Sequence, residues 1–152
     1  MTSNAPSTLR WHDNLLLGHA RMDESHEEFV GCLGALQAAP DGRLGEALEA
    51  LAQHADGHFS MEDAWMTATD FPARRCHIDE HAAVLASVRG VQRRVARGDL
   101  AVGRRLAAEL QSWFPAHAQH LDSALAHWMC QRRLGGRPVV LRRQIGASEA
   151  AP

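Results

Sequence analysis

Hydrophobic residues recur every three or four positions through most of this chain, which is the spacing of helices that bury one face. Helix-breaking residues interrupt the pattern at four places: Pro40-Asp41-Gly42, Asp70-Phe71-Pro72, Gly98-Asp99 and Gly135-Gly136. Between these breaks the pattern predicts four helices, over residues 23–39, 42–69, 73–97 and 100–134, and none of them alternates as a strand would. The sequence therefore predicts an all-α protein.

Long helices joined by short loops favour an up-down-up-down four-helix bundle. The 152 residues are enough for one domain with a hydrophobic core. We expect three parts: an N-terminal loop (residues 1–20), the bundle (residues 21–134) and a C-terminal tail (residues 135–152). Trp11 and Leu15 are expected to pack the N-terminal loop against the bundle.

Polar side chains interrupt the hydrophobic face of each predicted helix. His58 and Glu62 are four residues apart, so they point to the same side of their helix. His77 and His81 repeat this spacing in the next helix, and His26 lies on the hydrophobic face of the first. Buried imidazole and carboxylate groups need polar partners, because an unsatisfied one costs several kcal/mol.

The fourth helix carries His117 and Asp122, which are five residues apart. On a straight α-helix this spacing turns the two side chains about 140° away from each other. Pro115 lacks a backbone N–H, so we expect it to disturb the helix just before His117.

Metal ions would satisfy all of these groups together. Imidazole suits iron, zinc or copper, and a carboxylate can bridge two cations. Seven ligands exceed the four of a structural zinc site and suit two metal ions held between facing helices. Each pair alone is common on helices that bind no metal, so the prediction depends on the whole set. The predicted ligands are His26, His58, Glu62, His77, His81, His117 and Asp122.

The same residues form an ordered series of motifs, DxxH, HFxxE, HxxxH and HxxxxD. They stand here as Asp23-Glu24-Ser25-His26, His58-Phe59-Ser60-Met61-Glu62, His77-Ile78-Asp79-Glu80-His81 and His117-Ala118-Gln119-His120-Leu121-Asp122. Over about residues 11–129 the chain resembles the hemerythrin family, specifically its single-domain bacterial members. Each motif is weak alone, but the ordered set is specific. The family also places its aspartate five residues after the histidine.

The resemblance implies a non-haem di-iron centre that cycles between Fe2+ and Fe3+, with a bridging oxo or hydroxo group and dioxygen as its ligand. Carried over by position, one iron would be bound by His77, His81 and His117, the other by His26 and His58, and both by the bridging Glu62 and Asp122. The iron with two histidines would keep an open coordination position.

Four aromatic residues are expected to wall the pocket with apolar surface: Phe29, Phe59, Trp113 and Phe114. Ordinary core packing explains the same residues, and both roles are compatible. Family members often carry a tyrosine near the centre, whereas this chain has no tyrosine. The Phe114-Pro115 pair is also less usual. These two departures bear on the pocket geometry and the oxygen affinity, not on the ligand set.

The function that the resemblance implies is reversible dioxygen binding, for storage, delivery or sensing. A ligand set rich in histidine fits this better than the carboxylate-rich sets of oxidising di-iron bundles. We therefore expect a binding protein rather than an enzyme. Two alternatives stay open: a di-iron enzyme that reduces peroxide or nitric oxide, and a helical interaction module that binds zinc or no metal.

Charge and hydropathy bear on the partners and the cellular location of the protein. A net charge of −2 gives no reason to expect nucleic acid or an anionic membrane as partner. No apolar run approaches ~20 residues, and residues 1–10 lack the apolar segment of a signal peptide, so we expect a cytoplasmic protein. Any redox or signalling role would need a separate partner protein.

Cysteines and the other histidines are expected to stay outside the centre. Cys32, Cys76 and Cys130 fit neither a disulfide framework nor a CxxC site, so we expect free and mostly buried thiols. The other histidines are expected at the surface or around the site: His12, His19, His54, His120 and His127. Among them, His54 lies one helical turn before His58 and is expected nearest the site.

Overall fold

The structure is a computed structural model that describes residues 8–134. Its helices are α1 (Ala20–Ala38), α2 (Leu44–Ala68), α3 (Arg74–Ala96), α4 (Leu100–His117) and α5 (Ser123–Leu134), with 3-10 turns at Asp13–Leu15 and Asp41–Arg43. A π-helical segment, Ala118–Asp122, joins α4 to α5.

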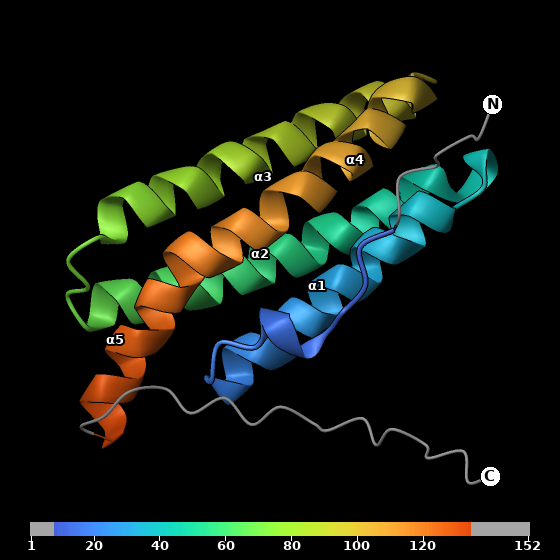
Figure 1. Ribbon diagram of the computed structural model, residues 1–152. Helices are drawn as coiled ribbons and strands as arrows, with labels where there is room; N and C mark the ends of the chain where they lie inside the picture. Colours follow the sequence, from blue (N-terminus) through green and yellow to red (C-terminus); the bar gives the residue numbers. More distant parts are fainter. Residues whose placement is uncertain (1–7, 135–152) are drawn as a thin grey trace, which may run out of the picture.

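Helices α1, α2, α3 and the continuous run from α4 to α5 pack antiparallel as a four-helix bundle (Figure 1). No strand occurs within residues 8–134. The predicted fold is confirmed, and the fourth predicted helix has the bounds of the whole α4–α5 run. The predicted tail lies outside the described residues, and the division into loop, bundle and tail stays a prediction.

Helix α1 begins three residues earlier than predicted because side chains organise its first turn. The backbone N–H groups of Leu17 and Gly18 donate to the Asp23 carboxylate at 2.7 and 3.1 Å. His19 Nδ1 accepts a hydrogen bond from Met22 N at 3.2 Å and so caps the helix. His19 is only 5% exposed, and its ring lies 4.9 Å from that of Trp65.

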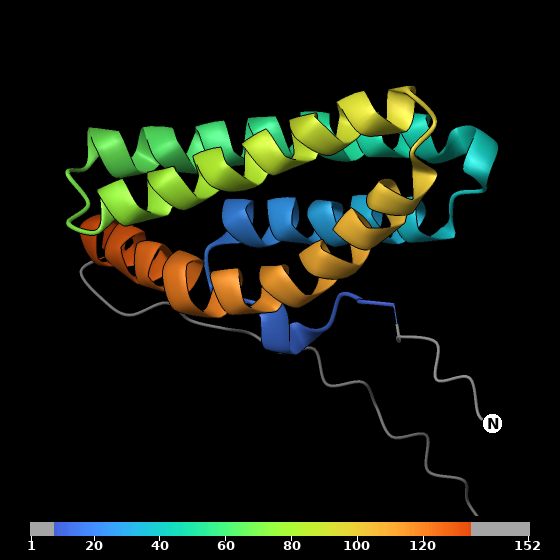
Figure 2. The same cartoon turned by 90° about the horizontal axis from the view of Figure 1, so that it is seen from above.

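The fourth helical run is irregular, but not where Pro115 led us to expect. Helix α4 continues through Pro115 to His117, and the π-helical turn follows His117 instead of preceding it. A π-helix bonds residues five apart, so it brings them to one face. This turn therefore places Asp122 on the side of His117. The run curves around the bundle (Figure 2).

The buried interior has three layers along the bundle axis. A large apolar layer fills the half of the bundle near the loop between α1 and α2. It includes Leu33, Leu36, Leu44, Leu48, Leu51 and Val88. A small apolar layer at the other end contains Met22, Met66, Phe71, Leu125 and Ala126. Between them lie the buried polar residues of the predicted site. We call this middle layer the polar layer.

The cysteines are free, as predicted. Cys130 is buried and Cys32 is half-buried, but Cys76 is exposed, so the prediction of mostly buried thiols is wrong for Cys76. None of the helices described is long and apolar enough to cross a bilayer.

Candidate metal centre

The seven predicted ligand residues meet in the polar layer, and each is at most 5% exposed. All four helical runs of the bundle contribute: His26 from α1, His58 and Glu62 from α2, His77 and His81 from α3, and from the fourth run His117 at the end of α4 and Asp122 in the π-helical segment. The i, i+4 spacing aligns the pairs on α2 and α3, and the π turn aligns the pair on the fourth run.

The Glu62 carboxylate faces two sets of histidines with its two oxygens. Oε1 lies 3.1 Å from His58 Nε2 and 3.6 Å from His26 Nε2. Oε2 lies 3.3 Å from His81 Nε2 and 3.6 Å from His77 Nε2. One carboxylate thus contacts imidazoles from three helices.

The Asp122 carboxylate is divided in the same way. Oδ2 lies 2.9 Å from His26 Nε2. Oδ1 lies 2.9 Å from His77 Nε2 and 3.1 Å from His117 Nε2. Two halves follow, which share both carboxylates: the three-histidine half (His77, His81 and His117) and the two-histidine half (His26 and His58). Within each half the ligand atoms, carboxylate oxygens included, lie within 4.8 Å of one another.

The donor set fits two cations. Both nitrogens of His26 and His77 and all four oxygens of Glu62 and Asp122 are buried, and none has a partner in good hydrogen-bonding geometry among the described residues. Such atoms are rare in native interiors because each costs about 1–3 kcal/mol. Two bridged metal ions would satisfy the inward-facing atoms at once. The buried cluster is therefore consistent with a di-metal site.

Protonation without metal supports this interpretation. Burial alone would lower the pKa of His26, but the carboxylates of Asp122 and Glu62 raise it to about 9. Burial would also raise the pKa of Asp122, yet the facing imidazoles hold it well below its ordinary value. The metal-free layer thus pairs ionised carboxylates with protonated imidazole, and cations would replace those protons.

Three side chains that the sequence did not reveal contact the histidines at Nδ1, the ring nitrogen that faces away from Glu62 and Asp122; we call it the outer nitrogen. Ser25 Oγ lies 2.7 Å from His58 Nδ1. Asp63 Oδ1 lies 2.7 Å from His81 Nδ1, and Glu80 Oε1 lies 3.2 Å from His117 Nδ1. Each is adjacent in sequence to a predicted ligand, so its side chain points about 100° away from the ligand face. Only the packing of neighbouring helices reveals these contacts.

The four aromatic residues lie on one side of the cluster. Phe59 stacks on His81 with ring centroids 4.2 Å apart, and Trp113 stacks on His117 at 4.4 Å. Phe114 meets His26 edge-on at 5.3 Å, and Phe29 stacks on Phe114 at 5.0 Å. They join the polar layer to the large apolar layer, and their role as walls of a ligand pocket stays a prediction.

Of the other histidines, His54 approaches the site. Its ring is nearly parallel to that of His58, with centroids 6.2 Å apart, and its Nε2 lies 2.9 Å from the Ser25 carbonyl oxygen. His12 and His120 are exposed and His127 is half-buried.

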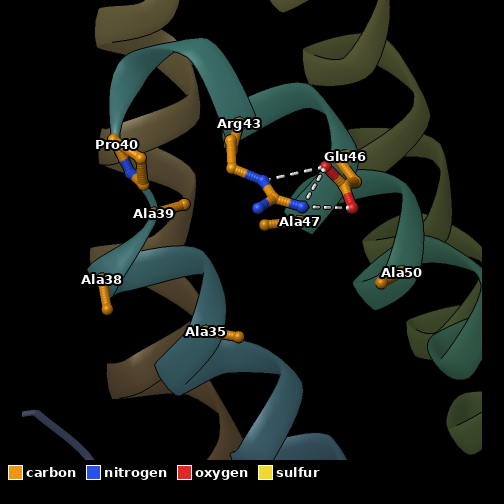
Figure 3. A pocket seen from close by; sticks show the side chains of 8 residues that line it. All are labelled: Ala35, Ala38, Ala39, Pro40, Arg43, Glu46, Ala47 and Ala50. Atoms are coloured by element: carbon orange, nitrogen blue, oxygen red, sulfur yellow. Dashed lines mark hydrogen bonds and ion pairs between the residues drawn. The ribbon is translucent and has the colours of Figure 1, made fainter.

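A surface groove at the far end of α1 and α2 is separate from this centre. Figure 3 shows its alanine-rich wall and the ion pair between Arg43 and Glu46, whose atoms approach to 3.0 Å. Ala39, in the same wall, is 13 residues beyond His26, about 20 Å along the helix axis. None of the seven predicted ligands lines the groove.

An antiparallel helical bundle that buries five imidazoles around two shared carboxylates fits the class of bundle proteins that hold a pair of metal ions between their helices. Comparison with known proteins agrees. The chain belongs to the hemerythrin family: the model of the hemerythrin HHE cation binding domain matches residues 17–128. The chain is also 43% identical over 124 residues to the bacteriohemerythrin of Ralstonia nicotianae, which covers 82% of this chain and 90% of that protein. No solved structure matches significantly.

Proposed function

We propose that this protein binds dioxygen reversibly at a di-iron centre and serves oxygen storage, delivery or sensing. Its ligands are His26, His58, Glu62, His77, His81, His117 and Asp122. One observation carries the proposal: both buried carboxylates turn one oxygen to each half of the histidine cluster. Two bridged metal ions need this arrangement, and one ion would not.

The halves differ in the number of ligand residues that they offer. The three-histidine half has five, and the two-histidine half has four. A metal site with fewer protein ligands keeps a position for an external molecule. We therefore propose that dioxygen binds on the side of His26 and His58, which is also the half that Phe114 contacts. Two irons held by these residues would supply the two electrons that reversible reduction of dioxygen to the peroxide level needs, one from each ion.

The surrounding side chains would protect that chemistry. Phe29 and Phe114 are at most 3% exposed; Phe114 contacts His26, and Phe29 stacks on Phe114. Apolar surface of this kind keeps water and protons from a metal centre, and it controls the effective dielectric there. The relative from Ralstonia nicotianae, named a bacteriohemerythrin, supports the same function for this chain.

The test combines metal analysis with absorption spectra. The chain is expressed with iron, reduced without oxygen, exposed to air and then deoxygenated. We expect two irons per chain, a nearly colourless reduced form, and charge-transfer bands that appear in air and disappear on deoxygenation.

Other outcomes would contradict the proposal. Two irons that oxidise once and never return, together with steady turnover of peroxide or nitric oxide and an electron donor, would identify an enzyme instead. Zinc in place of iron, or a colourless protein that chelators leave unchanged, would identify a helical interaction module.

A further inference from the structure

The outer hydrogen bonds of the histidines differ between the two halves. In the three-histidine half, two imidazoles contact carboxylates: His81 contacts Asp63 at 2.7 Å and His117 contacts Glu80 at 3.2 Å. In the two-histidine half, His58 contacts the neutral Ser25 hydroxyl at 2.7 Å. The outer nitrogens of His26 and His77 have no partner among the described residues.

The chemistry of these partners is not equivalent. The Nε2 atoms of His58, His81 and His117 face the bridging carboxylates, so a metal-bound imidazole would carry its proton on Nδ1 and donate it outward. A charged acceptor makes that bond roughly twice as strong as a neutral acceptor does. It also raises the basicity of the imidazole toward the metal.

Packing holds the two outer carboxylates in position. Glu80 Oε1 accepts a second hydrogen bond, at 2.8 Å, from Trp113 Nε1, and the Trp113 ring stacks on His117. Asp63 follows Glu62 on α2 and reaches across to α3. The Asp63 and Glu80 side chains are 33% and 37% exposed, so water solvates part of each charge and a buried unpaired ion is avoided.

We propose that Asp63 and Glu80 are positioning residues that make the three-histidine half the tighter metal-binding half and the half that favours Fe3+ more strongly. Ser25 gives the two-histidine half a weaker version of the same contact. This inference rests on the proposed di-iron centre for its redox part. Its binding part applies to any divalent metal ion that the cluster accepts.

The first test measures zinc binding to the metal-free protein, by competition with a fluorescent chelator. We expect two stepwise dissociation constants. The variants D63N and E80Q should weaken the tighter step by about 10- to 100-fold, the usual result of losing such a partner. S25A should weaken mainly the looser step. D79N is the matched control, because Asp79 is exposed and adjacent to Glu80 but makes no described contact with the cluster.

The second test measures midpoint potentials of the iron-loaded protein. Each carboxylate-to-amide variant should raise the potential of the three-histidine iron, because Fe3+ plus one electron gives Fe2+ and the variant stabilises Fe3+ less. A tenfold change in the relative affinity for the two oxidation states corresponds to about 59 mV. S25A should leave this potential unchanged.

Three results would overturn the inference: S25A weakening the tighter zinc step as much as E80Q does, D79N matching E80Q, or D63N and E80Q both binding zinc like the wild type. Because two variants address the same half, failure of one to fold leaves the other decisive. Expected zinc constants in a protein that does not bind dioxygen reversibly would support the inference and reject the proposed function.

Discussion

The large apolar layer and the polar layer come from the same helices but contribute oppositely to folding. In the apolar layer, Leu33, Leu36 and Leu51 are fully buried in one cluster between α1 and α2. Burial of each such side chain contributes roughly 1.5–3 kcal/mol to the free energy of folding. In the polar layer, Glu62 and Asp122 are buried just as completely, and protonated imidazole must offset the cost of taking their charges out of water until cations replace those protons. The comparison indicates that apolar packing above and below keeps an intrinsically costly layer in place.

The largest expected effect is a loss of metal from the polar layer when one bridging carboxylate is removed. Glu62→Ala removes the carboxylate that contacts both halves, so the chain should lose at least one of two metal ions. Metal content per chain is the measurement. Glu27→Ala is the control, because Glu27 is exposed and adjacent to His26. A Glu62→Ala protein with two irons and an unchanged spectrum would contradict the ligand assignment.

Removal of metal should destabilise the protein without unfolding it. Free metal at a thousandfold excess over its dissociation constant adds about 4 kcal/mol for one site, and that stabilisation disappears with a chelator. Hydrogen exchange should accelerate in the polar layer, around residues 58–62, 77–81 and 117–122, while residues 44–52 stay protected. Uniform acceleration along α2 would mean that the layers do not unfold separately.

A cavity in the large apolar layer should have the opposite effect: it should lower stability and leave metal binding unchanged. Leu48 is 1% exposed and ten residues from His58, about 15 Å along α2. Leu48→Ala should lower the free energy of unfolding by about 2–5 kcal/mol and leave the metal content of the folded protein unchanged. Denaturant unfolding measures the first quantity. Thr67→Ala, at an exposed position of α2, should change stability by no more than about 0.5 kcal/mol.

The smallest expected effect is the release of protons when metal binds. The pKa of His26 is raised to about 9 in the metal-free layer, so His26 is protonated at pH 7.5 and must lose that proton to bind metal. Metal binding should release at least one proton per chain at pH 7.5, and this release should decline as the pH rises through about 9. Calorimetry in buffers with different ionisation enthalpies measures it. Release that does not vary with pH between 7.5 and 10 would rule out His26 as the source.

The sequence predicted the features that helix geometry alone determines. The spacings in His58–Glu62 and His77–His81 align any two such residues, so the shared direction of four of the proposed ligands could be derived without a structure. Asp122 could not, because hydrophobic periodicity does not reveal a π turn, and it was supported only by the expected disturbance at Pro115 and by the family resemblance. The contacts of Asp63 and Glu80 cross from one helix to another, so they depend on how each helix is rotated about its axis. Cys76 was misjudged for the same reason.

The π-helical turn also has a consequence for the numbering of the fourth helix. After His117, Asp122, Leu125 and Ala126 are buried at offsets of five, eight and nine, and Ala118 and Cys130 are buried as well. If one residue between them is left out of the count, the offsets become four, seven and eight, which is the repeat of an uninterrupted amphipathic helix. The turn thus contains one surplus residue, and Gln119 and His120 at its exposed side are where that residue is accommodated. The helix therefore carries an insertion without a change of phase, and the hydrophobic side of α5 continues that of α4.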